Sequence, residues 1–180
     1  MTYADLQAMF PKHLRPAYSH VVEQGLPRLN EQMRAGGITT PRRIAAFLTT
    51  LAFESMFEFN IDQIGATSKY HGRGYIQLTG LANYTAAGKY LGIDLVNNPD
   101  LAKSLDWSAK IARWYWTVAR PNTNAYADAL QMGRVNAMIG YPLSAPGGDG
   151  LTNDQRRCAA FAAALKYLTG SVPAGITCTR

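Results

Sequence analysis

Three carboxylates follow one another closely in the first third of the sequence: Glu54, Glu58 and Asp62. Glu54 lies in an apolar stretch with helical spacing and projects within about 20° of Phe47 around a helix axis. A carboxylate on such an apolar face costs free energy unless it is paired or protonated, and burial raises its pKa. The position suits a general acid working near neutral pH, and it also suits a glutamate that pairs with a core-facing arginine.

Glu58 lies one helical turn after Glu54, and Asp62 follows just beyond the helix end that we expect near residues 57–60. Inverting hydrolysis of a glycosidic bond needs a second carboxylate roughly 6.5–9.5 Å from the acid, with room for a water molecule between them. We choose Asp62 as this base, because Glu58 would share a helix face with Glu54 and crowd it. The structural alternatives are a solvated helix end for Glu58 and a loop cap for Asp62.

A glycine-rich and aromatic segment, residues 70–79, reads Tyr-His-Gly-Arg-Gly-Tyr-Ile-Gln-Leu-Thr. Its two glycines let the backbone approach another element closely. Gln77 and Thr79 would face one side of a strand, where an amide and a hydroxyl could bind sugar hydroxyl and acetamido groups. Tyr70 and Tyr75 offer flat apolar faces for sugar rings. The same pattern fits a hairpin buried under a helix, so this segment alone does not decide a function.

The rest of the chain has mostly helical spacing, and we expect the 68–78 region to form one small β-hairpin insertion. Pro27 is expected to open a short helix ending at Gly36-Gly37, and Thr40 is expected to cap the helix that carries Glu54. Further helices are expected from Thr79 to Gly92, from Asp106 or Ser108 to Pro121, over residues 124–139, and from Thr152 or Asn153 through Leu168. The pattern predicts a mostly α domain.

The length of 180 residues and an apolar content of 47% predict one domain over residues 1–180 and argue against disorder. No apolar run is long enough to span a bilayer, and the first residues do not resemble a secretory signal peptide. The net charge of +6 favours anionic partners such as cell-wall polymers. The absence of a dense Lys/Arg block argues against a nucleic-acid partner.

Cys158 and Cys178 are the only cysteines, and they could equally form a disulfide or remain two thiols. His13, His20 and His71 are scattered along the chain, so no group of residues has the spacing of metal ligands. We therefore expect no metal and no cofactor.

Four separated blocks, at residues 49–55, 70–79, 83–84 and 97–101, occur together in this sequence. In type and order they resemble glycoside hydrolase family 19, which holds chitinases and the chitinase-like domains of phage endolysins. The resemblance extends over residues 40–170. It implies a lysozyme-like, mostly helical fold and inverting hydrolysis without a metal, with Glu54 as the general acid.

The resemblance also implies sugar contacts at Gln77, Thr79 and Asn83. The chain departs from the family pattern at Phe53, where the family has histidine, and at Asp62, where the family has a glutamate base. A later family block is degraded around Asn136, and the arginine that follows it maps to Arg156. The full set of expected substrate-binding residues is Tyr70, His71, Tyr75, Gln77, Thr79, Asn83, Asn136 and Arg156.

The short span from Glu54 to Gly72 and the missing signal peptide favour the compact endolysin type over the plant chitinases. We therefore expect a monomeric enzyme that is made in a host cytoplasm and cuts the glycan of peptidoglycan after release, either alone or as one module of a longer chain. The alternatives are a chitinase, a lytic transglycosylase that uses Glu54 alone, and a glycan-binding module without catalysis.

Overall fold

The computed structural model describes residues 1–140 and 146–180 of the chain, and these are mostly helical. The α-helices are α1 (Tyr3–Met9), α2 (Ser19–Ala35), α3 (Pro41–Ser55), α4 (Leu81–Leu91), α5 (Ser108–Trp114), α6 (Thr123–Asp128), α7 (Met132–Ile139) and α8 (Asn153–Thr169). Short 3₁₀ turns form η1 (Pro16–Tyr18) and η2 (Pro99–Lys103), and the π-helical turn η3 (Tyr115–Ala119) continues α5.

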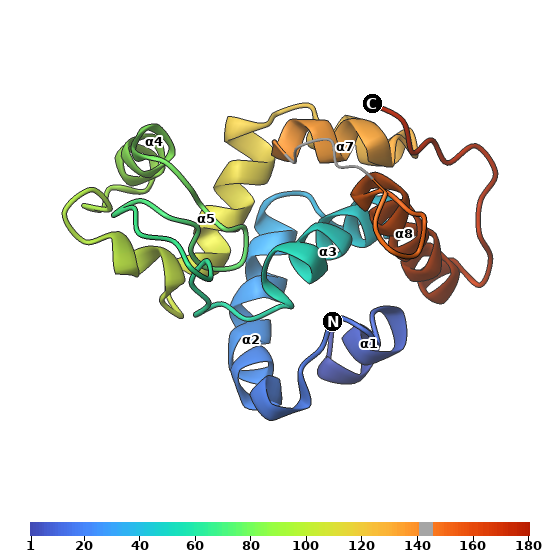
Figure 1. Cartoon of the computed structure of the whole chain (residues 1–180), viewed down its shortest axis with the longest axis horizontal. Coiled ribbons are helices and arrows are strands. Elements are labelled where there is room, and N and C mark those ends of the chain that lie inside the picture. Colours follow the sequence, from blue (N-terminus) through green and yellow to red (C-terminus); the bar gives the residue numbers. More distant parts are fainter. Residues whose placement is uncertain (141–145) are drawn as a thin grey trace.

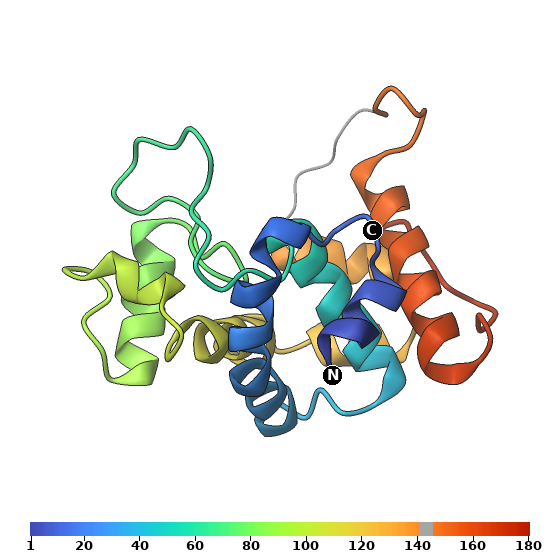
Figure 2. The same ribbon diagram turned by 90° about the horizontal axis from the view of Figure 1, so that it is seen from below.

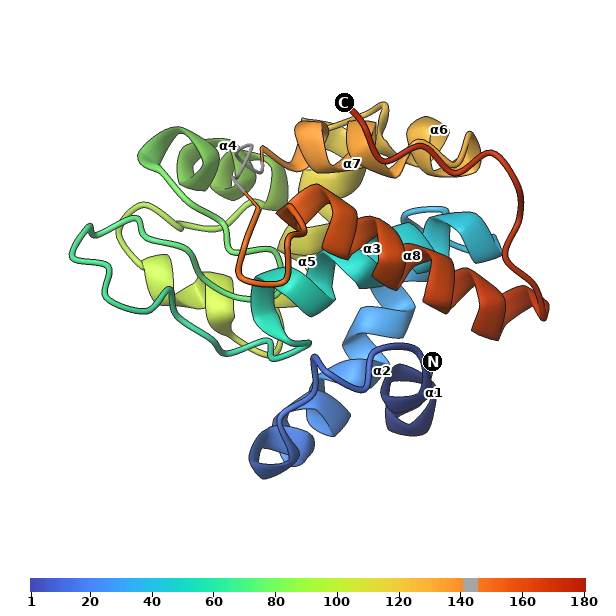
Figure 3. The same ribbon diagram turned by 45° about the vertical axis from the view of Figure 1, so that its right-hand side comes forward.

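Helix α3 lies at the centre of the molecule and packs along α8 (Figures 1 and 3). It begins as expected, because the Thr40 side chain accepts a hydrogen bond from the Arg43 amide and Pro41 occupies the first turn. The helix is buried on most sides, so its apolar residues, among them Phe47, form part of the core. It ends at Ser55, earlier than predicted, because Met56 and Phe57 adopt left-handed backbone conformations with φ of 52° and 64°.

Two other helix boundaries differ from the sequence prediction. Pro27 does not open a helix but lies inside α2, which already begins at Ser19. Proline removes one internal hydrogen bond, and the packing of the buried side of α2 outweighs that loss. The single helix expected over residues 124–139 is two helices, α6 and α7, separated at Leu130, whose φ of 58° is incompatible with a continuous helix.

The segment between α3 and α4 forms the small β element of the fold. It appears as two isolated antiparallel bridges, Asp62 with Arg73 and Arg73 with Leu78, and not as a longer ladder. The buried Arg73 side chain also organises this segment: its Nε donates to Asp100 Oδ1 at 2.9 Å and its Nη1 donates to Tyr84 Oη at 3.0 Å. Charged hydrogen bonds therefore supply here much of what a β ladder would supply elsewhere.

Figure 1 shows α4 and η2 at one end of the molecule, with the segment between α3 and α4 beside them. Helices α1, α7 and α8 lie towards the other end, and α2, α3 and α5 lie between. The loop that follows α3 and the segment that leads into α8 project on the same side (Figure 2). None of the helices in the described residues combines the length and the apolar character that a membrane span requires.

Gly74 provides a test of how this segment is attached. Its φ is +70°, and a Cβ atom built on it would lie 2.2 Å from the Ala102 carbonyl oxygen. Gly74→Ala is therefore expected to lower the free energy of unfolding by roughly 2–4 kcal/mol in urea denaturation. Gly148→Ala is the control, because nothing lies within 4 Å of its built Cβ. Equal stability of both variants would show that residues 61–79 do not dock on η2 as described.

Candidate active site

A cavity of about 460 Å³ opens between α3, the 61–79 segment and α7. Residues from widely separated parts of the chain line it: Glu54, Gln63, Ile76, Gln77, Thr79, Asn83, Tyr115, Ile139 and Gly140. This cavity brings together the carboxylate and the amide and hydroxyl groups that the sequence singled out as candidate chemistry.

Glu54 occupies the last turn of α3, with 14% of its side chain exposed in the cavity. Its Oε1 accepts a hydrogen bond of 2.8 Å from Nη2 of Arg157, whose side chain is fully buried. Burial raises the pKa of Glu54, and this effect outweighs the opposing influence of the Arg157 charge. Both properties that the sequence suggested for Glu54 therefore occur together. Its side chain pairs with a core-facing arginine, and its pKa lies above the ordinary value.

The arginine at the site is Arg157 and not Arg156. Arg156 pairs with Asp149 outside the cavity, while the Arg157 guanidinium lies over the Phe53 ring at 5.0 Å and reaches Glu54. The arginine that contacts Glu54 is thus one position later than the one predicted, and substrate contact by Arg156 stays a prediction. Helical spacing could have found the right residue, because Arg157 lies four positions before Phe161, a core residue of α8, whereas Arg156 is turned about 100° away.

Gln77, Thr79 and Asn83 lie in the same cavity as Glu54. Gln77 has a left-handed backbone, with φ of 50°, and its Nε2 donates to the Gly74 carbonyl at 3.1 Å. Such a conformation in a non-glycine residue costs on the order of 1–3 kcal/mol and is commonest at functional sites. Gly72 makes room for it, since a Cβ there would lie 2.7 Å from Gln77 Oε1. Sugar binding by these three residues stays a prediction.

Asp62 lies in a cluster of cations next to the cavity residue Gln63. Its carboxylate pairs with Lys103, accepts from His71 Nε2 at 2.9 Å and lies 3.4 Å from Arg73 Nε. Partial burial alone would raise the pKa of Asp62, but the hydrogen bonds from Lys103 and His71 outweigh it and lower the pKa. Asp62 therefore stays ionised, as a base must, while its assignment as the base stays a prediction.

Glu58 differs most from its expected surroundings. It lies beyond the end of α3, so it does not share a helix face with Glu54, and only 2% of its side chain is exposed. Its two carboxylate oxygens accept from Nε and Nη2 of Arg15 at 2.7 and 2.5 Å. The expected solvated helix end is wrong. This bidentate pair instead fastens the segment before α2 to the end of α3.

Several expected sugar-binding residues lie outside the cavity lining. Tyr75 is 1% exposed and packs near Gly25 and Phe59, so its ring offers no face to a ligand, and burial raises its pKa. Tyr70 packs on Tyr84 and donates its hydroxyl to the Val96 carbonyl. Alternation along a strand suggested exposed faces here, but residues 61–79 form a folded loop without that alternation.

His71 and Asn136 are also engaged elsewhere. The His71 ring lies between Asp62 and the Ser68 carbonyl, and it orients the candidate base. Asn136 is fully buried, and its Nδ2 donates to Asp154 Oδ1 at 2.9 Å. The prediction that Asn136 contacts substrate is therefore wrong for this structure.

Another part of the cavity wall is formed by Tyr115, Ile139 and Gly140, which the sequence pattern does not single out. The Tyr115 hydroxyl donates to the Ile139 carbonyl at 3.1 Å and accepts from Arg120 Nη2 at 3.0 Å. Tyr115 falls within the helix expected from Asp106 or Ser108 to Pro121, and no local signal distinguishes a core tyrosine from one that borders a cavity. Within the described residues, no group of three or more His, Cys, Asp or Glu side chains could hold a metal ion. That activity needs no metal stays a prediction.

A carboxyl group with a raised pKa in an open cavity can donate a proton to a bound leaving group, and an ionised carboxylate can accept one from water. Comparison with known proteins agrees with this chemistry. Residues 57–139 match the family model Glyco_hydro_19, described as chitinase class I. The chain resembles glycoside hydrolase family 19 in sequence and in fold. The expected family resemblance and the lysozyme-like helical fold are thus confirmed.

The individual relatives are chitinases. Chitinase 8 of Oryza sativa subsp. japonica is 50% identical over 62 residues, which cover 34% of this chain and 24% of that protein. An endochitinase of Avena sativa is 41% identical over 81 residues, covering 42% of this chain and 40% of the relative. The chain thus spans less than half the length of these relatives. Chitinase C from Streptomyces griseus HUT6037 superimposes with a TM-score of 0.72 at 26% identity, over 98% of this chain and 79% of the other.

The Glu54–Arg157 pair generates a prediction about pH. A general acid must be protonated, so glycosidase activity is expected to fall as the pH rises through the raised pKa of Glu54. Arg157→Met removes the charge that lowers this pKa and leaves burial, which raises it. The alkaline limb of the kcat/KM profile should then move to higher pH, while Arg156→Met leaves it in place. A limb that stays fixed or moves down in Arg157→Met would remove Glu54 as the titrating group.

The two remaining carboxylates give opposite predictions. Asp62→Asn should lower kcat by roughly 10²-fold or more, because it can no longer accept a proton. Glu58→Gln should keep kcat but lower the free energy of unfolding by about 1–3 kcal/mol, because it weakens the buried pair with Arg15. Asp62→Glu, which restores the family residue, is the matched control and should stay active. A folded but inactive Glu58→Gln would transfer the base to Glu58.

Proposed function

We propose that this protein is a glycoside hydrolase that cleaves β-1,4-linked N-acetylglucosamine polymers of the chitin type. The observation that carries the proposal is Glu54, a largely buried carboxyl with a raised pKa that lines one cavity together with Gln77, Thr79 and Asn83. The chitinase relatives, of which the chain covers less than half, support the same substrate class.

In the proposed reaction Glu54 protonates the glycosidic oxygen as the bond to the anomeric carbon breaks. Asp62, kept ionised by its cationic neighbours, takes a proton from a water that attacks the opposite face of the sugar. This division of roles inverts the anomeric configuration and requires space for the water between the two carboxyl groups. The side chain of aspartate is one methylene shorter than glutamate, which widens that space.

Peptidoglycan is the second candidate substrate, and the net charge of +6 favours it, because bacterial cell walls are anionic. On this reading the chain is an endolysin-type monomer that is made in a host cytoplasm and acts on the wall after release, alone or as one module of a longer protein. A lytic transglycosylase would need Glu54 alone, and a binding module would need neither carboxylate.

Product analysis with Glu54→Gln tests the proposal. The wild-type protein should release reducing-end oligomers of inverted anomeric configuration from soluble chitin, as read by NMR immediately after cleavage. Glu54→Gln should lower the rate by about 10²–10⁴-fold while it still binds the oligomer, because only the transferable proton is lost. More than a tenth of wild-type activity in the variant would exclude Glu54 as the acid.

Mass spectrometry of digests from purified peptidoglycan separates the alternatives. Cleavage of peptidoglycan but not chitin would select the second candidate substrate. Anhydro-sugar products would replace hydrolysis by transglycosylation. Binding to both polymers without release of any sugar end would reduce the protein to a binding module.

A further inference from the structure

The segment that follows α8 returns to α7 and forms hydrogen bonds with residues at or just before the start of that helix. The Thr177 amide donates to the Leu130 carbonyl at 3.0 Å, and the Thr177 carbonyl accepts from the Gly133 amide at 3.1 Å. The second contact satisfies an amide in the first turn of α7 that has no partner within the helix. A Cβ on Gly133 would lie 2.3 Å from the Thr179 carbonyl oxygen, so α7 and residues 177–180, here named the strap, are in tight contact.

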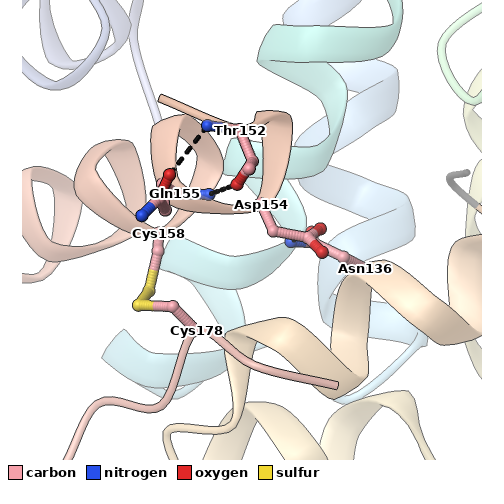
Figure 4. The surroundings of a disulfide bond; sticks show 6 residues. All are labelled: Asn136, Thr152, Asp154, Gln155, Cys158 and Cys178. Atoms are coloured by element: carbon pink, nitrogen blue, oxygen red, sulfur yellow. Dashed lines mark hydrogen bonds between the residues drawn. A yellow bond between two sulfur atoms is a disulfide. The ribbon is translucent and has the colours of Figure 1, made fainter. Parts of the chain in front are cut away.

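The strap is also joined to α8 by one ionic link and by one disulfide, which Figure 4 shows. Cys178 forms a disulfide with Cys158, which resolves the alternative left open by the sequence. Arg180 donates to both oxygens of Asp154, from Nε at 2.9 Å and from Nη2 at 3.2 Å. The Asp154 side chain is 12% exposed, so this pair is largely shielded from water. Asp154 also accepts from Asn136 of α7.

The Asn136–Asp154 contact connects two parts of the candidate site. Residues three positions apart in a helix lie on neighbouring parts of one face. On α7, Ile139 follows Asn136 by three positions and lines the cavity; on α8, Arg157 follows Asp154 by three positions and binds Glu54. The Asn136–Asp154 contact thus lies one helical turn from the cavity residue Ile139 on α7. It also lies one helical turn from Arg157, the partner of Glu54, on α8.

We propose that Arg180 is a positioning residue for the reaction: by holding Asp154 against Asn136, it sets the spacing between the α7 wall of the cavity and the Glu54–Arg157 pair. This role rests on the proposed function for its effect on catalysis. It also gives a role to Asn136, whose buried position excludes the expected contact with substrate. The disulfide next to Arg157 fixes the strap on which Arg180 is carried.

Arg180→Met tests the inference, because methionine keeps an apolar stem and removes both hydrogen bonds. Arg180→Lys is the conservative variant, which retains the charge and can reach Asp154 with one ammonium group. Tyr167→Phe is the matched control, because it removes a different tertiary link of α8, the 2.7 Å hydrogen bond from its hydroxyl to Asp5 on α1. All proteins are compared in the oxidised, full-length form.

We expect Arg180→Met to lower kcat by about 3- to 10-fold, the effect of losing one or two hydrogen bonds, and to change KM less. Arg180→Lys should recover part of the loss, and Tyr167→Phe should leave kcat unchanged. Hydrogen exchange at the Gly140 amide should become faster in Arg180→Met alone, because the end of α7 is less constrained. This readout does not require activity, so it decides the positioning role even if the wild-type protein cleaves no aminosugar polymer.

Reduction of the Cys158–Cys178 disulfide provides a second test of the inference. Dithiothreitol gives two electrons and two protons to the disulfide, so that Cys158 and Cys178 become thiols while the reagent closes to its own cyclic disulfide. Because both links hold one strap, reduction should lower kcat in the wild-type protein but add little in Arg180→Met. The inference is overturned if Arg180→Met matches Tyr167→Phe in kcat and in Gly140 exchange, or if the effects of reduction and Arg180→Met multiply independently.

Discussion

The buried pair of Glu54 and Arg157 is the constraint on which the other features of the site depend. A buried carboxylate on the central helix, α3, is unfavourable unless a cationic side chain pairs with it. That side chain must come from an element that packs on α3. Helix α8 does so along its length and delivers a fully buried guanidinium. Because the hydrogen bond between Arg157 and Glu54 joins α3 to α8, the two helices must keep one register. The cavity lies beside a carboxyl group whose orientation this contact fixes.

The loop-rich end of the molecule is stabilised by a different set of interactions. Few ladder hydrogen bonds hold residues 61–79, and the segment depends on Arg73, which reaches Asp100 and Tyr84 from inside the fold. The same cationic cluster surrounds Asp62. One set of charges thus stabilises the segment and keeps a carboxylate ionised, so a change in either property is expected to affect the other.

The sequence predicted what periodicity and caps control. The start of α3 at Thr40 and Pro41 and the start of α8 at Thr152 follow from local chemistry, and both capping hydrogen bonds are present. The end of α3 and the break at Leu130 depend on left-handed residues that are not glycine, which no local pattern announces. Tyr75 and Asn136 were misplaced for a related reason: tertiary packing, not local alternation, decides which polar and aromatic side chains are buried.

The environments of the carboxylates also explain why their roles can differ. Burial dominates at Glu54 and raises its pKa, whereas at Asp62 the hydrogen bonds from Lys103 and His71 together outweigh burial and lower the pKa. Two carboxyl groups whose pKa values are pushed apart can be protonated and ionised at one pH, which acid–base catalysis requires. Glu58 differs from both, because it is only 2% exposed and Arg15 pairs with both of its oxygens. The difference between the three groups lies in what surrounds each carboxylate, and α3 contributes by ending at Ser55, so that Glu58 does not share a helix face with Glu54.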